Sequence, residues 1–187
     1  MGCVDGPNQG KCRDMVHVRE ARVPEDVVAV AGLDTSFLAE RELDIQPDGL
    51  GFSVAMRDLP VPRRKVYPVE AAPGGIVAVD GDDVIGYAEV GYVEWNRRAV
   101  LGHFYVANGR RRGGTGTALL AEAVRRAKGT GAWCLWLETQ NVNEPAIGFY
   151  LRRGFRICGL DTAFYDPDEL PGEAAVFLAM DLRDDSP

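Results

Sequence analysis

A loop rich in arginine and glycine, at residues 110–117, constrains this sequence more than any other feature. It reads Arg-Arg-Arg-Gly-Gly-Thr-Gly-Thr, and it follows a predicted strand, Arg98–Val106. Apolar residues at helical spacing come directly after it. Backbone N–H groups at a helix N-terminus attract anions, and glycines let a ligand approach the backbone closely. The pattern predicts a site for a phosphorylated ligand, to which Arg111 and Arg112 contribute charge-assisted hydrogen bonds.

Three kinds of nucleotide site use such a loop. A P-loop requires a lysine before its Ser or Thr, and Gly114–Thr117 has none. A dinucleotide-binding fold would use Glu138 as its ribose-binding acid, but it needs a third glycine where this chain has Leu119. That fold also needs parallel crossovers, whereas the strands before the loop look antiparallel. The pyrophosphate of coenzyme A fits the loop best.

The first half of the chain predicts one helix and several antiparallel strands. A short strand is expected at Val16–Arg19, a helix from Pro24 to about Leu38, and an irregular acidic stretch at Ala39–Gly49. The strands expected next are Phe52–Met56, Lys65–Val69, Gly75–Val79, Val84–Val93 and Arg98–Val106, with Pro60 and Pro62 as breakers and a hairpin turn at Asp80–Asp83. Together they predict an antiparallel meander.

The second half alternates strands and helices. The helix after the loop is expected to end at Gly129–Gly131. The elements expected after it are a strand at Trp133–Leu137, a helix at Glu144–Arg153, and strands at Phe155–Leu160 and Ala174–Asp181. This order predicts an α/β or α+β fold with a mixed, mostly antiparallel sheet. We expect a single domain at residues 15–187 after a flexible segment at residues 1–14.

The composition disfavours several classes of function. A net charge of −7 disfavours nucleic acid as a partner and favours a cationic ligand. No apolar run approaches the length of a transmembrane helix, and the N-terminus lacks an apolar signal segment, so we expect a cytoplasmic protein that does not bind membranes. Four cysteines without a C-x-x-C pair, together with two histidines, predict reduced thiols and no metal site.

Two regions of the chain together resemble the GNAT superfamily of N-acetyltransferases. Residues Arg111–Gly116 resemble its signature Gln/Arg-x-x-Gly-x-Gly/Ala, and Leu135–Asn143 with Ala146–Phe155 resemble its second coenzyme-contacting region. The resemblance implies the GNAT fold, with helices flanking a mixed sheet, and acetyl-CoA as the acetyl donor. The residues assigned to the coenzyme are Phe104, Val106, Arg111, Arg112, Gly113, Gly114, Thr115, Gly116, Thr117 and Asn143.

Further segments are similar to the streptothricin (nourseothricin) acetyltransferases of that superfamily, which acetylate an amine on the β-lysine chain of a cationic antibiotic. These segments are Lys65–Pro68, Tyr92–Asn96, Glu138–Asn143 and Gly159–Tyr165. One strand departs from the pattern, because those enzymes usually carry several acidic residues where this chain reads Leu-Gly-His-Phe-Tyr-Val at 101–106. We expect a small cationic amine as substrate, with streptothricin-type antibiotics first.

The resemblance implies direct attack of the amine on the acetyl thioester in a ternary complex. An alkylamine has a pKa near ~10.4, so only about one molecule in a thousand is neutral at pH 7 and a base is needed. Glu138 is the first candidate base, although it also fits a role in ordering the loop after its strand. His103 is the second, although a lone strand histidine is often structural. Tyr150 matches the tyrosine that protonates the leaving thiolate, although its helical spacing also suits the core.

The remaining candidates concern the coenzyme arm and the acceptor. Asn143 resembles a residue that contacts the pantetheine arm, and it also stands where a helix N-cap is expected. Substrate contacts are predicted for Trp95, Tyr105, Asp161 and Tyr165, and other carboxylates that suit a cation are Glu42, Asp44, Glu89 and Glu94. Two other functions stay open: a protein N-acetyltransferase, and a coenzyme A-binding module that has lost catalysis. A second copy of the chain, forming a homodimer, is included among the expected partners.

Overall fold

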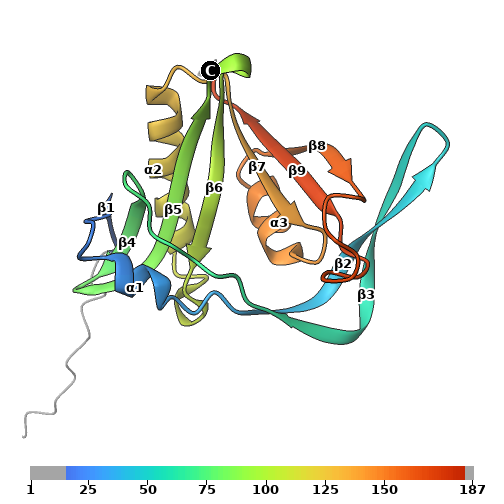
Figure 1. Ribbon diagram of the computed structural model, residues 1–187, viewed down its shortest axis with the longest axis horizontal. Coiled ribbons are helices and arrows are strands. Elements are labelled where there is room, and N and C mark those ends of the chain that lie inside the picture. The colour runs from blue at the N-terminus through green and yellow to red at the C-terminus, as the bar shows by residue number, and fades with distance from the viewer. Residues whose placement is uncertain (1–15, 184–187) are drawn as a thin grey trace, which may run out of the picture.

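A mixed seven-stranded sheet is the centre of the fold (Figure 1). The computed structural model describes residues 16–183, and the flexible segment predicted at residues 1–14 lies outside them. The strand order is β1-β4-β5-β6-β7-β9-β8. The bounds are β1 His17–Glu20, β4 Ile76–Asp80, β5 Asp83–Val93, β6 Arg98–Val106, β7 Cys134–Gln140, β8 Arg156–Asp161 and β9 Ala175–Asp181. Only β6 and β7 pair in parallel among these neighbours, which confirms the predicted mixed, mostly antiparallel sheet.

The two parallel strands separate after a short paired stretch. Arg98–Val100 of β6 pairs with Cys134–Trp136 of β7, and no pairing continues beyond. Both strands nevertheless run on, β6 to Val106 and β7 to Gln140, and Figure 1 shows them diverging. Backbone groups on the facing edges of these two segments are therefore open to a ligand with donors and acceptors of its own.

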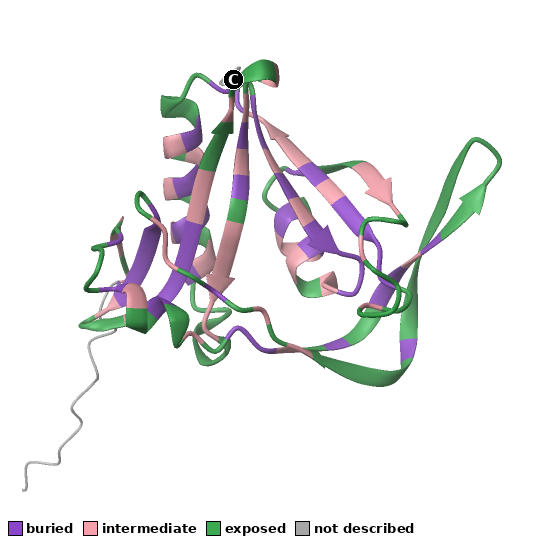
Figure 2. Ribbon diagram, viewed as in Figure 1, coloured by how far each residue is buried: buried purple, intermediate pink, exposed green. Residues whose placement is uncertain are grey.

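Helices pack against both faces of the sheet. Two of them, α2 (Thr115–Gly129) and α3 (Glu144–Leu151), join the main hydrophobic core on one face. The short α1 (Val27–Ala31) lies on the other face, where its Val30 packs against Val77 of β4. Alternate residues of a strand point to opposite faces, so one strand serves both cores. Figure 2 shows the buried positions gathered in the strands and on the side of α2 that meets them.

A long two-stranded ribbon extends from the body of the protein (Figure 1). It consists of β2 (Phe37–Asp48) and β3 (Gly51–Lys65), which pair antiparallel. The predictions of a helix to Leu38 and of an irregular stretch at 39–49 were therefore wrong, because α1 ends at Ala31 and β2 begins at Phe37. Alternate apolar positions of β2 pack into the main core, and this tertiary contact decides the conformation.

The prediction that Pro60 and Pro62 divide two short strands was also wrong. β3 is continuous from Gly51 to Lys65, and the ladder shifts register between Ala39 and Arg41 of the opposite strand. Both prolines lie in the stretch of β3 at this irregularity, where they have no ladder partner. Proline is tolerated there because no backbone N–H is needed.

The other elements agree with the predictions, apart from shifts at their ends. The hairpin of β4 and β5, the strand β6 and the helix α2 were all expected. The meander is shorter than predicted, because β3 pairs with β2 in the ribbon and not within the central sheet. Residues 66–69 form an irregular crossing from the ribbon to the sheet, although a strand was expected there. Within residues 16–183, no helix is both long enough and apolar enough to span a membrane.

Candidate functional site

The Arg/Gly loop forms a tight turn at the N-terminus of α2. Arg112 and Gly114 have positive φ angles, 64° and 96°, and these reverse the chain between β6 and the helix. Gly114 occupies the N-cap position, and no side chain caps the first turn of α2. The first N–H groups of a helix have no partner within it, so they point outward from this turn. The turn therefore offers backbone donors and a positive helix end to an anion.

The three arginines of the loop have different surroundings. Arg111 donates to three backbone carbonyls, those of Thr35, Ser36 and Val106, over 2.8–3.1 Å. Arg110 pairs with Asp80. Arg112 is exposed and forms no ion pair with the described residues. Arg111 thus ties the loop to the segment before β2, and the exposed Arg112 side chain is the one expected to contact a phosphate.

Arg153 is a cation near the turn that the sequence analysis did not select. It follows α3, and its guanidinium donates to the Thr117 hydroxyl over 2.5 Å and stacks 5.6 Å from the ring centroid of Phe149. Gly116 faces the same ring, since an added Cβ would lie 3.5 Å from Phe149. Arg153 belongs to the second motif region, but its sequence position alone gave no reason to place it beside the first.

Glu138 lies on β7 in the part that no longer pairs with β6. Its carboxylate accepts a hydrogen bond from the Tyr165 hydroxyl. Burial raises the pKa of Glu138 above the usual carboxyl value, and the Tyr165 hydrogen bond partly offsets the rise. A carboxylate with a raised pKa is a stronger base, so Glu138 is suited to accept a proton.

Tyrosines surround this carboxylate. Tyr105 of β6 and Tyr67 of the crossing segment have ring centroids 6.1 Å apart. Burial raises the pKa of both hydroxyls, and the nearby charge of Glu138 adds to the rise. Tyr67 also donates to the side chain of Gln140. The predicted residues Tyr105, Glu138 and Tyr165 are therefore brought together. Tyr67 joins them although it was not selected as a site residue, because its matched segment, Lys65–Pro68, gave no sign that it lies near Glu138.

Tyr150 lies on α3, with its ring in the main core and ring centroids 5.8 Å from Phe104 and 5.3 Å from Phe155. Burial raises the pKa of its hydroxyl, and Tyr105 adds to this effect. The phenol is therefore neutral at neutral pH and able to donate a proton. Its hydroxyl makes no hydrogen bond to a residue of the described chain, so the core position and a donor role are compatible.

His103 of β6 faces Tyr105, with ring centroids 5.8 Å apart. Its Nδ1 is buried and has no hydrogen-bond partner among the described residues. The register places it opposite Glu89 of β5. His103 lies on the strand next to the candidate base, and no hydrogen bond links the two residues. Its role as a second base stays a prediction.

The two asparagines after β7 have different roles. Asn143 occupies the N-cap position of α3 but makes no capping hydrogen bond, and its Nδ2 donates to the Thr139 hydroxyl over 3.3 Å. The predicted contact of Asn143 with the coenzyme arm stays a prediction. Asn141 is buried and bonds to Leu43 of the ribbon and to Ala174 beside β9. It holds the ribbon against the sheet.

The structure does not gather all of the predicted substrate residues. Trp95 is 84% exposed in a 3₁₀ turn, η1 (Glu94–Asn96), at the end of β6 opposite to the Arg/Gly loop. Glu94 lies with it, so neither residue reaches Glu138. Asp161 ends β8 and accepts a hydrogen bond from the Ala163 backbone, which shapes the turn toward Tyr165.

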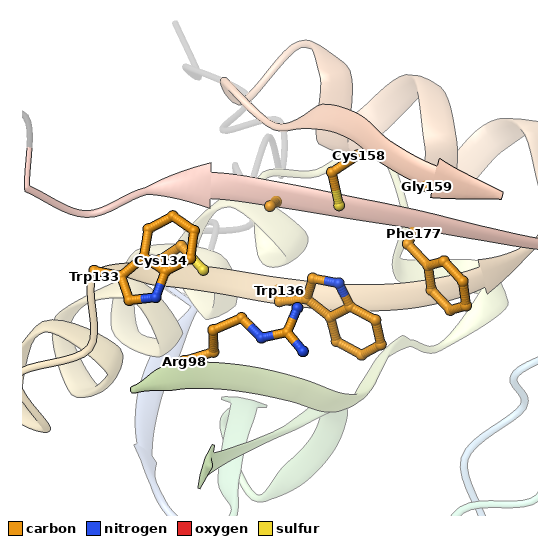
Figure 3. Close-up of a pocket in the computed structure, with 8 residues that line it drawn as sticks. Arg98, Trp133, Cys134, Trp136, Cys158, Gly159 and Phe177 are labelled. Carbon is orange, nitrogen blue, oxygen red and sulfur yellow. The ribbon is translucent and has the colours of Figure 1, made fainter. Parts of the chain in front are cut away.

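A hollow of about 340 Å³ lies where β6 and β7 still pair (Figure 3). Its walls include Arg98, Trp136, Phe177 and Cys158. The Arg98 guanidinium carbon lies 5.1 Å from the Trp136 ring centroid, and Trp136 stacks on Phe177. None of the predicted catalytic residues lines it. This hollow is therefore not the place where the predicted chemistry would occur.

The chain is similar to known acetyltransferases in sequence and in fold. Residues 45–155 match the acetyltransferase (GNAT) family. The streptothricin acetyltransferase of Streptomyces lavendulae is 39% identical over 178 residues, which cover 87% of this chain and 93% of the relative. The crystal structure of a nourseothricin acetyltransferase superposes with a TM-score of 0.82 at 38% identity, covering 89% of this chain and 98% of that one. The structure of a streptothricin acetyltransferase described as putative, from Bacillus anthracis in complex with acetyl coenzyme A, gives a TM-score of 0.77 at 25% identity, covering 89% and 99%.

Proposed function

Because this chain belongs to the GNAT acetyltransferase family, we propose that it transfers the acetyl group of acetyl-CoA to a primary amine of a streptothricin-type antibiotic. The amine attacks the thioester directly in a ternary complex. The observation that carries the proposal is the arrangement of the anion-binding turn and Glu138 at the divergence of β6 and β7.

The divergence suits the coenzyme. The pyrophosphate binds at the N-terminus of α2, with Arg112 and Arg153 as nearby cations. The pantetheine arm has amide groups that pair with the open edges of β6 and β7, where Phe104, Val106 and Asn143 lie. A relative of this chain has been crystallised in complex with acetyl coenzyme A, which supports the choice of donor.

Two proton transfers accompany the reaction. Glu138, whose pKa is raised by burial, accepts the proton of the attacking amine, either directly or through a water molecule. Tyr150, a neutral phenol in the core beside Phe104, donates a proton to the departing thiolate of coenzyme A. After the reaction Glu138 is protonated and Tyr150 is deprotonated. Proton exchange with solvent restores both groups before the next turnover.

The test is a turnover assay that detects free coenzyme A thiol. The acceptors are streptothricin, spermidine and an N-terminal peptide, each with acetyl-CoA. Streptothricin is expected to be the preferred acceptor and to gain the mass of one acetyl group. Preference for the peptide would support the protein N-acetyltransferase alternative. Binding of coenzyme A without turnover of any acceptor would support the binding-module alternative.

A further inference from the structure

A cavity of about 480 Å³ lies between the ribbon and the segment that leads into β9. Its walls come from β2 and β3 on one side and from residues 162–174 on the other. The polar residues that line it include Glu42, Asp44, Asn141, Tyr165 and Glu173. The cavity adjoins Glu138, the candidate base. Tyr165 lines the cavity, and its hydroxyl donates a hydrogen bond to the Glu138 carboxylate.

Glu173 has an unusual environment in this wall. Its side chain is only 4% exposed, and its Oε1 accepts a hydrogen bond from Lys65 Nζ over 2.6 Å. Its Oε2 is buried and has no partner within the part of the chain that the structure describes. A buried carboxylate oxygen without a hydrogen bond is unfavourable, so a donor from outside the chain would stabilise it.

The charges around the cavity favour a cation. Glu42 and Asp44 share one arginine, Arg57, which lies 2.6 Å from the first carboxylate and 3.8 Å from the second. The Arg57 side chain is 58% exposed, so solvent screens much of its charge. Lys65 contacts only one carboxylate oxygen of Glu173 and so offsets only part of its negative charge. The lining therefore carries more carboxylates than cations.

We propose that this cavity binds a second cationic group of a polyamine acceptor, an ammonium or guanidinium, with Glu173 Oε2 as its hydrogen-bond acceptor. The inference rests on the proposed function, because the first amine of the same acceptor reacts beside Glu138. Tyr165 lies between the reacting amine at Glu138 and the second cation in the cavity, because it contacts Glu138 and also lines the cavity. Glu173 thus supplies the negative charge that strand β6 lacks at 101–106.

Other contacts place Glu173 and the reaction site in one environment. Burial raises the pKa of both Tyr67 and Tyr165, and the charge of Glu173 contributes to each rise. The hydrogen bond from Tyr165 to Glu138 also raises the pKa of the Tyr165 hydroxyl. A polyamine that spans the two carboxylates would contact Tyr165 along its chain, so the site would select acceptors with two separated cations.

The test measures binding apart from chemistry. Titration calorimetry in the presence of coenzyme A uses streptothricin and spermidine as probes, with wild type and Glu173→Gln. Glutamine keeps an oxygen for Lys65 but loses the charge, so both probes are expected to bind about tenfold to a hundredfold more weakly. In steady-state kinetics, KM for streptothricin is expected to rise by a similar factor, with kcat and the affinity for coenzyme A retained.

A second variant guards against loss of folding. Ala163 is exposed and lines the cavity, so Ala163→Arg places a cation there without disturbing the core. Ala163→Arg is expected to weaken the binding of both probes, whereas the matched control Ala163→Gln is expected to leave it unchanged. Thermal melts verify that each variant folds. If Glu173→Gln does not fold, the binding measured with Ala163→Arg decides whether the cavity holds the second cation.

The outcomes separate the two proposals. If wild type acetylates streptothricin, and both variants bind and turn it over as wild type does, the subsite is wrong while the function stands. If spermidine binding depends on Glu173 and no acceptor is acetylated, the subsite stands and the function is wrong. If wild type binds neither probe, both are wrong.

Discussion

The Tyr165 hydroxyl donates a hydrogen bond to the carboxylate of Glu138, although the two residues are 27 positions apart in the chain. This bond opposes the effect of burial, which raises the pKa of the same carboxylate. Tyr165 therefore keeps the pKa of Glu138 lower than burial alone would make it, and its hydrogen bond holds the carboxylate in one orientation.

Glu138→Gln is expected to lower kcat by about 10²–10⁴-fold, because it removes the proposed general base and keeps the side-chain shape. Acetyl-CoA affinity should be retained. Rapid-quench kinetics with streptothricin measure the acetyl-transfer step directly. Turnover within a factor of a few of wild type would assign the base to another group, with His103 next to be tested.

Tyr165→Phe is expected to move the acidic limb of the kcat/KM profile to higher pH. The base must be deprotonated, so activity falls as the pH decreases through the pKa of Glu138. Without the Tyr165 hydroxyl nothing offsets the effect of burial, and the pKa of Glu138 rises further. An unchanged acidic limb in the folded variant would show that Glu138 does not control it.

Glu138→Gln is also expected to raise the melting temperature at neutral pH. The folded pKa of Glu138 lies above its unfolded value, so the native state binds more protons, and stability falls as pH rises through this window. The gain should vanish below about pH 4, where both states are protonated. Glu122→Gln is the control of opposite sign, because its hydrogen bond to Arg125 lowers the pKa of Glu122 to about 2.

Tyr150→Phe is expected to lower kcat by about 10²–10⁴-fold and to leave acetyl-CoA affinity nearly intact. The ring contacts with Phe104 and Phe155 remain, so stability should change little. Steady-state kinetics and calorimetry with coenzyme A check both parts. A variant as active as wild type would leave Tyr150 with a packing role only.

The two arginines assigned to phosphate are expected to behave differently. Arg111→Ala removes three hydrogen bonds to backbone carbonyls and should cost about 1–3 kcal/mol of stability. Arg112→Gly should weaken coenzyme A binding about tenfold without lowering stability, because the residue has a φ of 64°, which glycine adopts readily. Calorimetry and thermal melts test the pair, and equal effects of both changes on affinity would contradict this division.

The local parts of the fold were accessible from the sequence. The predicted strand Arg98–Val106 has the same bounds as β6, and α2 ends at Gly129, as expected, because period and glycine positions are local signals. The second motif region likewise contains Glu138, which lies on β7 beyond its pairing with β6, and Tyr150, whose ring lies beside that of Phe104. Apolar and polar residues alternate so weakly in β2 that the ribbon was missed.

The tertiary parts of the site were not accessible in this way. Lys65 and Glu173 form an ion pair across 108 positions, and Tyr67 meets Gln140 across 73. No spacing rule links residues so far apart, and a single carboxylate in an irregular segment resembles a surface residue until its burial is known. The same limit explains Trp95, whose motif match gave no sign that it lies at the opposite end of β6.

The double change Gly102→Glu, His103→Asp tests whether strand β6 limits the affinity for a cationic acceptor. Both positions lie in the part of β6 where the related enzymes usually carry acidic residues. Gly102 is exposed, and an added Cβ there meets no atom within 4 Å. His103 faces Tyr105 on the strand beside Glu138. The change is therefore sterically tolerated and adds negative charge near the proposed amine site.

Two added carboxylates are expected to lower KM for streptothricin by about tenfold or more, since a hydrogen bond to a charged group contributes about 1.5–3 kcal/mol. The neutral pair Gly102→Gln, His103→Asn controls for shape and should leave KM unchanged. Asp at position 103 would stand opposite Glu89, so a modest loss of stability is expected from this like-charge pair. If wild type is already highly active and the double change has no effect, the neutral strand does not limit binding. The charge must then come from elsewhere, and a further loss of affinity on adding Glu173→Gln would assign it to the cavity beside the ribbon.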